Sequence, residues 1–230
     1  MYTGIPLIDL DVFVYRAGFA SEGEPESHAR YTVKRMLEQV IDKFDRGLSY
    51  RGFLTASDKS NYRFAVAKEA VYKGNRADSK KPQHYDVVRE YLIKWWKAEV
   101  IQGKEADDAL GCAQTDETCI VSIDKDLLMI PGAHYNFVKD EYKVITEQDG
   151  WKNFYTQLLT GDRTDNICGV KGIGPKTAAK ILAACKSKSS LHKTVTSVYK
   201  EHYGSKATSL MKERGALLWI QREPGVVWSP

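Results

Sequence analysis

The chain has 230 residues, of which 43% are hydrophobic and 28% charged, a composition typical of globular domains that excludes a largely disordered chain. No apolar run approaches the roughly 20 residues that cross a bilayer, so we expect no membrane partner. The four cysteines form no CxxC pair, the five histidines form no HxxxH pattern, and no basic leader precedes an apolar run. We therefore expect reduced thiols, no zinc site and a cytoplasmic location.

The net charge of +4 combines two unlike segments. Residues 166–230 contain eleven Lys and Arg but three Asp and Glu, whereas residues 1–165 contain 23 basic and 27 acidic residues. Basic residues hold phosphates and carboxylates hold cations, so this division is typical of a polyanion-binding segment beside an acidic catalytic region. Chance differences between solvated helix faces are the alternative, and the charge alone does not decide between them.

Three short apolar runs, each ending at an acid, recur in the first half of the chain. They span residues 4–9, 52–58 and 118–124. Each is typical of a buried parallel strand that presents a carboxylate at its carboxyl end. Between them we expect helices at about residues 30–46, 85–96 and 105–114. The alternation predicts an α/β fold with a mostly parallel central sheet, in which ligands bind beyond the carboxyl ends of the strands.

After Thr146 the pattern becomes helical. We expect helices at residues 148–160, 176–184, 191–202 and 205–220. The sequence therefore predicts two domains, an α/β core over residues 1–160 and a helical subdomain over residues 161–230. Within the core, polar residues at about 74–84 predict an exposed, mobile loop.

Acidic side chains gather at the ends of the predicted elements. They are Asp9, Asp58, Glu105, Asp107, Asp108, Asp124, Asp126, Asp162 and Asp165. Converging carboxylates repel one another unless cations are present, and oxygen-only sites favour Mg²⁺ or Mn²⁺. Two such ions can activate a water and stabilise the leaving oxygen of a phosphodiester. Taken singly, acids at a helix start can instead stabilise that helix, and Asp is common in turns.

The glycine-rich residues 169–179 predict a helix–hairpin–helix within residues 166–184. Pro175 separates Gly174 from Lys176, so the segment is not a P-loop. Tight turns before a helix N-terminus present backbone N–H groups to a phosphate, which suits the DNA backbone rather than its sequence. A plain turn between helices is the alternative. The candidate DNA contacts are Lys171, Gly172, Gly174, Lys176, Thr177 and Lys180.

These motifs, in this order, resemble the 5′→3′ exonuclease/flap endonuclease family, most closely its short bacteriophage members. The matching segments are residues 7–11, 57–58 with Arg63, 72–76, 105–108, 122–126, 161–166, 169–179 and 226–230. The resemblance implies a PIN-like nuclease core and two-metal hydrolysis of phosphodiesters at or near 5′ ends. It also implies a role in phage DNA replication or primer removal, within the cytoplasm of a host cell.

The resemblance further implies roles for single residues. The nine acids would hold the two ions, with Asp124 or Asp126 near both. Asp124, Lys73 and Arg76 would be catalytic, the two cations stabilising charge on the scissile phosphate. Arg63, Tyr72 and Tyr15 would contact DNA, Tyr15 by stacking on a terminal base unless it belongs to the core.

The resemblance also implies partners and a further ion. A potassium ion would bind carbonyls of the helix–hairpin–helix. A monomer would bind duplex or branched DNA with a 5′ end or flap, or an RNA primer–DNA hybrid. Only about 28 residues separate Arg76 from Glu105, which predicts a short or loop-like arch rather than a long helical one. Asp11 receives no role.

Three other functions fit parts of the sequence. Asp9-Leu10-Asp11-Val12 fits the nucleophile motif of haloacid-dehalogenase-type phosphatases, with Asp9 attacking phosphate. That interpretation leaves residues 72–76, 105–108 and the hairpin unexplained. A non-catalytic DNA structure-binding module would keep the acids without using them. A PIN-type ribonuclease would share the sheet and acids but would not need the basic hairpin segment.

Overall fold

The computed structural model describes residues 2–45, 49–58, 60–76 and 79–230. The chain divides into two compact units. Unit 1 comprises Met1–Ser60, Lys80–Leu127 and Gly132–Val144, and unit 2 comprises Asn61–Ser79, Leu128–Pro131 and Ile145–Pro230. Residues 61–79 and 145–160 thus lie with the C-terminal helices, which the sequence did not predict. The domain boundary at residue 160 stays a prediction. The middle of the loop predicted at residues 74–84 lies outside the described residues.

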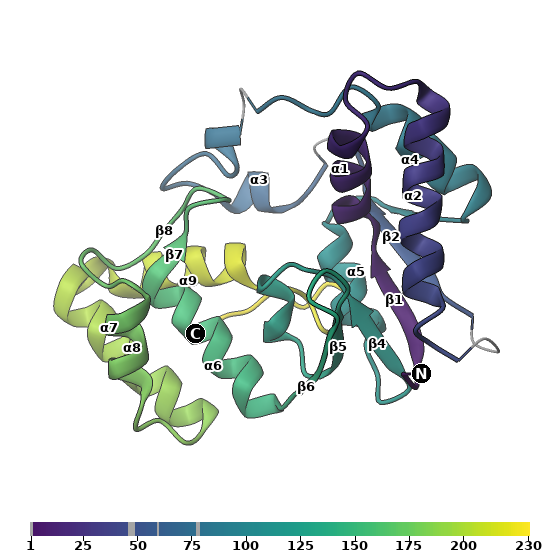
Figure 1. Cartoon of the computed structure of the whole chain (residues 1–230). Coiled ribbons are helices and arrows are strands. Elements are labelled where there is room, and N and C mark those ends of the chain that lie inside the picture. Colours follow the sequence, from purple (N-terminus) through teal and green to yellow (C-terminus); the bar gives the residue numbers. More distant parts are fainter. Residues whose placement is uncertain (1, 46–48, 59, 77–78) are drawn as a thin grey trace. The chain divides into compact units, whose positions relative to one another are not determined.

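A six-stranded sheet forms the centre of unit 1 (Figure 1). Its strands, in spatial order, are β3 (Glu99–Ile101), β2 (Arg51–Thr55), β1 (Ile5–Asp9), β4 (Thr118–Val121), β5 (Gly132–Asn136) and β6 (Glu141–Ile145). The pairs from β3 through β5 are parallel, with Leu7 opposite Ile120 and Asp9 opposite Phe53. The predicted α/β fold with a mostly parallel sheet is confirmed, and the three acid-terminated runs coincide with β1, β2 and β4 within three residues at either end.

Helices cover this sheet. They are α1 (Leu10–Ala20), α2 (Glu26–Ile41), α4 (Tyr85–Trp95) and α5 (Ala106–Ala113). Helices α1, α2 and α4 pack on one another and bury Phe13, Val33 and Leu92 with the strand residues Ile8 and Leu54 in one core. Helix α5 packs against β1 and β2. The sequence did not predict α1, because its β-branched and aromatic residues follow β1 without a break.

Unit 2 is built mainly from helices. They are α3 (Arg63–Val66), α6 (Glu147–Thr160), α7 (Pro175–Leu182), α8 (Lys188–Tyr203) and α9 (Ala207–Leu218), with a short antiparallel pair β7 (Gly161–Asp162) and β8 (Ile167–Cys168). The last four helices match the four predicted ones within a few residues. Trp219 and Trp228 pack against Phe154 of α6, with ring centroids 5.2 and 5.1 Å away. No helix in the described ranges is long and apolar enough to cross a bilayer.

Candidate active site

Asp9 lies at the carboxyl end of β1, in the interior of unit 1. Its side chain is buried, 3% exposed, and Ser122 Oγ, just past β4, donates to its Oδ2 over 2.7 Å. The same Ser122 Oγ accepts from the backbone N–H of Asp124 over 3.0 Å. Because β1 and β4 are parallel neighbours, their carboxyl ends bring Asp9 and the Asp124 segment together.

The environment of Asp9 suits a cation. The pKa of Asp9 is raised to about 7, mainly by burial and also by the nearby charges of Asp11 and Asp124, against the lowering effect of the Ser122 hydrogen bond. A buried carboxylate beside two others is costly without a counter-charge, and a divalent ion with oxygen ligands supplies one. The donor set around Asp9 therefore fits Mg²⁺ or Mn²⁺.

Asp11, which received no role from the sequence, holds the end of β2. Its Oδ2 accepts from the backbone N–H of Thr55 over 3.0 Å, and its Oδ1 lies 3.4 Å from Nη1 of Arg89. Arg89, buried on α4, also donates from Nη2 to the carbonyl oxygen of Thr55 over 2.8 Å. Thr55 Oγ1 in turn accepts from the N–H of Ala106, the first residue of α5. This network links the segments that present Asp9, Asp58 and Glu105, and the sequence did not reveal Arg89.

The acids at the start of α5 stabilise that helix. Glu105 is the N-cap residue and forms a capping box with Asp108, which accepts from the Glu105 N–H over 3.1 Å. Asp108 is fully buried, whereas Asp107 is half-buried. The helix-stabilising interpretation thus holds for Glu105 and Asp108. A capping carboxylate keeps further lone pairs, so metal binding by these acids stays a prediction.

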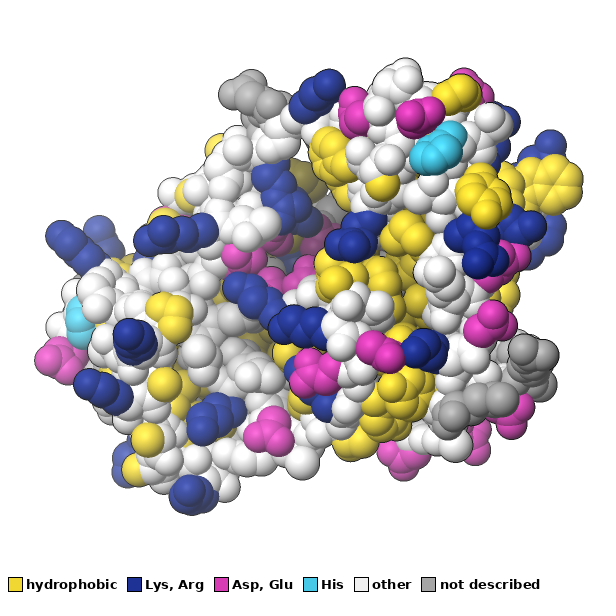
Figure 2. All heavy atoms as spheres, viewed as in Figure 1, with side chains coloured by type: hydrophobic (Ala, Val, Ile, Leu, Met, Phe, Trp, Pro, Cys, Tyr) yellow, Lys and Arg dark blue, Asp and Glu magenta, His cyan; other side chains and the backbone are white. Residues whose placement is uncertain are grey.

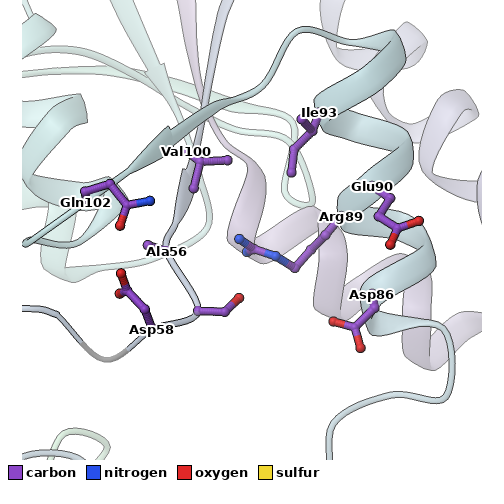
Figure 3. Close-up of a pocket in the computed structure, with 9 residues that line it drawn as sticks. Ala56, Asp58, Asp86, Arg89, Glu90, Ile93, Val100 and Gln102 are labelled. Atoms are coloured by element: carbon purple, nitrogen blue, oxygen red, sulfur yellow. The ribbon is translucent and has the colours of Figure 1, made fainter.

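Asp58 lines a pocket of unit 1 at the carboxyl ends of β2 and β3. The pocket has a volume of about 350 Å³ and is lined in part by Arg89, Glu90, Val100 and Gln102. Figure 3 shows Arg89 extending from α4 toward the Ala56–Asp58 segment. Asp58 is exposed, and hydrogen bonds from Ser60 hold its pKa below the ordinary value.

Two further acids follow β4. Asp124 is exposed, and its Oδ1 accepts from the N–H of Asp126, over 2.8 Å. Asp126 is half-buried and begins a 3₁₀ turn, Asp126–Met129. Both carboxylates therefore stand beyond the same end of the sheet as Asp9, as the sequence predicted from the strand order.

In unit 2, three residues of the motif at 72–76 contact the carboxylate of Asp165. Tyr72 Oη donates to its Oδ2 over 2.8 Å, and Arg76 Nη2 donates to its Oδ1 over 2.6 Å. Lys73 Nζ stands 3.8 Å from Oδ2. Asp162, also in unit 2, is buried, and its Oδ1 accepts from the N–H of Thr164. The candidate phosphate-binding cations and a candidate metal ligand thus form one cluster within this unit.

Arg63 and Tyr72, two of the predicted DNA contacts, are buried. Each is 2% exposed, and the Arg63 guanidinium donates to the carbonyl oxygens of Leu217 and Trp219 over 2.9 and 2.6 Å. Its guanidinium pairs with carbonyl oxygens at the C-terminal end of α9, which have no partner within the helix. In this structure Arg63 therefore fixes α3 against that end instead of presenting charge to DNA. The burial gives no support to a direct DNA contact by either side chain.

The glycine-rich segment lies between β8 and α7. The predicted helix–hairpin–helix at residues 166–184, all of which the structure describes, contains only one of its two helices, α7. The helix that precedes the hairpin is α6, which lies outside the predicted range. A Cβ on Gly169 would collide with the backbone of Thr160, so the crossing of these two segments requires glycine there. Pro175 is the first residue of α7 and Gly174 its N-cap. All six candidate DNA contacts of this segment are exposed: Lys171, Gly172, Gly174, Lys176, Thr177 and Lys180.

Lysines outnumber acidic residues on α7 and α8, which hold five Lys and one Glu. Figure 2 shows basic side chains scattered over this part of unit 2, with few acidic side chains between them. The charge division expected from the sequence therefore coincides with a basic surface on these helices. Among the described residues, no three His, Cys, Asp or Glu side chains lie grouped as a metal-binding set.

Solved structures share this fold. The flap endonuclease of bacteriophage T5, in a complex with DNA and metal ions, matches with a TM-score of 0.55 and 16% identity, over 93% of this chain and 98% of that one. The T5 5′-exonuclease with bound zinc matches with a TM-score of 0.55 and 18% identity, over 94% and 98%. Flap endonuclease-1 from Methanococcus jannaschii matches with a TM-score of 0.60 and 13% identity, over 97% and 80%.

Curated relatives match in sequence. DNA polymerase I from Thermus thermophilus is 27% identical over 240 residues, which cover 94% of this chain and 28% of that protein. The enzyme from Thermus aquaticus is 32% identical over 181 residues, 70% of this chain and 21% of that protein. The chain thus spans about a quarter of the length of these relatives. No family model matches the sequence.

These comparisons confirm the expected resemblance. The chain has the fold of the 5′-exonucleases and flap endonucleases, which the acid-terminated strands, the 72–76 motif and the glycine-rich hairpin predicted together. Its solved neighbours in that fold include proteins of bacteriophage T5, the group whose motifs the sequence resembles most.

Proposed function

We propose that this chain is a divalent-metal-dependent nuclease that hydrolyses phosphodiesters at or near 5′ ends of duplex or branched DNA. The observation that carries the proposal is Asp9, a buried carboxylate at the carboxyl end of β1 beside two further acids. The fold agrees with it, since the similar solved structures are named as exonucleases and flap endonucleases, some with DNA or metal ions.

The proposed site uses carboxylates to hold cations. We propose as ligands of two Mg²⁺ or Mn²⁺ ions all nine acids: Asp9, Asp58, Glu105, Asp107, Asp108, Asp124, Asp126, Asp162 and Asp165. When bound, such ions activate the attacking water and stabilise the leaving oxygen. Ser122 orients Asp9 by its hydrogen bond, and Asp11 with Arg89 fixes the segments from which the other acids of unit 1 project.

The cations of unit 2 are proposed to bind the substrate backbone. Lys73 and Arg76 would bind the scissile phosphate, exchanging the Asp165 carboxylate for a phosphate oxygen, and so stabilise its developing charge. Lys171 precedes α7 and Lys176 lies in its first turn, where backbone N–H groups suit a phosphate of the duplex, and Lys180 lies in its last turn. A potassium ion at the hairpin carbonyls, and an RNA primer–DNA hybrid as substrate, remain parts of the same proposal.

The experiment that tests the function uses 5′-labelled and 3′-labelled duplexes and a 5′-flap substrate, each with Mg²⁺, Mn²⁺ or EDTA. We expect metal-dependent release of short 5′ products by the wild-type chain and their loss in Asp9→Asn. A generic phosphatase substrate runs beside them. Intact DNA with a hydrolysed phosphatase substrate would establish the aspartyl-phosphate alternative, and intact but tightly bound DNA would establish a binding module.

The biological setting follows from the same chemistry. An enzyme that shortens 5′ ends or removes flaps serves DNA replication and primer removal, and we propose such a role in a phage, in the cytoplasm of its host. The chain is proposed to act as a monomer. A preference for an RNA–DNA hybrid over duplex DNA in the same cleavage assay would specify primer removal.

A further inference from the structure

Arg214 of α9 is buried in unit 2, where its guanidinium joins three other segments of that unit. The residue is 2% exposed, and its Nε and Nη2 donate to the two carboxylate oxygens of Glu69 over 2.8 and 2.6 Å. Its Nη1 donates to the carbonyl oxygen of Gly169 over 3.2 Å and to Tyr203 Oη over 3.1 Å. One side chain thus contacts the segment that leads into the 72–76 motif, the beginning of the glycine-rich hairpin, and the end of α8.

Two aromatic rings hold the guanidinium in this orientation. Arg214 Cζ lies 4.9 Å from the centroid of the Tyr203 ring and 5.6 Å from that of the Tyr199 ring. Tyr203 Oη also donates to the carbonyl oxygen of Gly169 over 3.2 Å, so two donors converge on one acceptor. The planar fork of an arginine can serve these acceptors together, whereas a lysine ammonium cannot. We call Arg214, Glu69 and Tyr203 the Arg214 cluster.

On one side, the cluster fixes the segment that precedes the 72–76 motif. Glu213, next to Arg214 on α9, accepts from the backbone N–H groups of Lys68 and Glu69 over 2.6 and 2.7 Å. Glu69 is therefore held by its backbone as well as by its side chain, three residues before Tyr72. Helix α9 thus anchors the point from which the motif begins.

The motif itself depends on such support. Lys73 has a φ of 54°, a left-handed conformation that residues other than glycine rarely adopt. Its N–H donates to the carbonyl oxygen of Asp165 over 2.9 Å. The Asn166 side-chain amide donates to the carbonyl oxygen of Val71, also over 2.9 Å. A backbone conformation of this kind persists only where the surrounding structure imposes it.

On the other side, the cluster fixes the beginning of the hairpin. The carbonyl of Gly169 accepts from Arg214 and Tyr203, and the next N–H, that of Val170, donates to the carbonyl oxygen of Leu159 over 2.7 Å. Helix α7 begins six residues after Gly169, at Pro175. Because the hairpin is this short, a displacement of its first residue would also displace the N-terminus of α7.

We propose that Arg214 is a positioning residue that holds the 72–76 motif and the hairpin at a fixed separation. The inference rests on the proposed function in one respect, that both elements bind phosphates of one DNA substrate. Lys73 and Arg76 then meet a phosphate at a set distance from the duplex phosphate held at α7. Because a misplacement of about 1 Å can cost about a hundredfold in rate, this separation governs both the rate and the position of cleavage.

Two substitutions weaken the cluster from its opposite sides. Glu69→Gln keeps the size of an exposed side chain but removes the charge that pairs with Arg214. Tyr203→Phe keeps the ring but removes the hydroxyl that donates to Gly169. The matched control is Glu147→Gln, which removes the same charge from another pair in unit 2, that with Arg222, whose Nη1 lies 2.8 Å from Oε1 of Glu147. Thermal unfolding of each variant verifies that it is folded.

Hydrogen exchange of backbone amides detects the coupling without DNA or metal. We expect Glu69→Gln to speed exchange in residues 169–174 as well as in 71–76, by about threefold or more. Tyr203→Phe should likewise speed exchange in 71–76 as well as in 169–174, and Glu147→Gln should change neither segment. Faster exchange confined to the side that carries the substitution would overturn the inference.

Cleavage of a 5′-flap substrate supplies a second readout. At saturating enzyme we expect Glu69→Gln to lower the single-turnover rate by about tenfold and to spread the cut over neighbouring positions. Its affinity for duplex in EDTA should stay within about twofold of the wild type, since the lysines of α7 are unchanged. Rates and product lengths like those of Glu147→Gln, or a loss of affinity as large as the loss of rate, would overturn the positioning role.

The two readouts separate this inference from the proposed function. A wild-type chain that cleaves no DNA with Mg²⁺ or Mn²⁺ would remove the nuclease, and the exchange measurement would still decide whether Arg214 couples the two segments. Normal cleavage by the wild type, with exchange in the variants that stays confined to the substituted side, would overturn the inference and leave the nuclease in place.

Discussion

Arg76 Nη2 donates to Asp165 Oδ1 over 2.6 Å, although the two residues are 89 positions apart in the sequence. The Arg76 side chain is 42% exposed and that of Asp165 16%, so the pair lies at the surface of unit 2 with its carboxylate turned inward. A guanidinium held in this way is oriented but still accessible to a phosphate oxygen. The relationship couples a proposed substrate-binding cation to a proposed metal ligand.

Arg76→Ala should lower the cleavage rate by about a hundredfold or more, because it removes a charged donor from the developing phosphate charge. Folding stability should change by only about 1 kcal/mol, since the pair is partly solvated. Single-turnover cleavage and duplex binding in EDTA measure the two effects separately. Arg163→Ala, an exposed arginine of the neighbouring turn, is the control. Cleavage that falls only in proportion to binding would make Arg76 a general DNA contact.

Unfolding of the metal-free protein should depend on pH through Asp9. Its pKa is raised from 3.8 to about 7 by burial, so the folded state binds this proton more tightly than the unfolded state does. The stability contribution is therefore complete below about pH 4 and is lost as the pH rises through about 7, by a few kcal/mol. Urea unfolding in EDTA across this range should show the loss in the wild type and a weaker dependence in Asp9→Asn. Parallel curves for the two proteins would contradict the prediction.

Breaking the Arg214–Glu69 pair should destabilise unit 2. Arg214 is 2% exposed, and its Nε and Nη2 donate to the two oxygens of Glu69 over 2.8 and 2.6 Å. Removing Arg214 leaves the exposed carboxylate of Glu69 to be screened by water, but it deprives the carbonyl oxygen of Gly169 of its arginine donor, at a cost of about 1–3 kcal/mol. We expect a loss of this size in urea unfolding of Arg214→Met. Restoring part of it with Glu69→Gln in the same chain would identify the unpaired carboxylate as the cause; no recovery would point to lost packing.

Lys176→Glu should weaken duplex binding and make its dependence on salt shallower by about one counterion. Lys176 is exposed in the first turn of α7, where the helix N-terminus already favours a phosphate. Binding constants measured over a series of salt concentrations give the slope. Lys200→Glu, which places the same charge change on α8, is the control. An unchanged slope for Lys176→Glu would remove the hairpin from the DNA interface.

The sequence by itself determined the elements that depend on neighbouring residues. The runs ending at Asp9, Asp58 and Asp124 are apolar enough to be buried strands, and they became β1, β2 and β4 with their acids beyond the same sheet edge. Helix α6 begins after Thr146, whose Oγ1 accepts from the Asp149 N–H. Periodicity and capping act over a few residues, so they can be recognised without the fold.

Only the tertiary structure decided which charged residues face solvent and which support the fold. Arg63 lies in a motif that predicted a DNA contact, yet its guanidinium donates to the carbonyl oxygen of Leu217, 154 positions away. Asp11 and Arg89 are 78 positions apart, and their contact gives both a structural role. Such pairs form only when the elements pack together, because a hydrogen bond depends on the distance between two atoms in space. A local sequence pattern does not specify that distance. The sequence therefore determined the acids and strands of the proposed site, and packing determined which of the neighbouring cations are exposed to solvent.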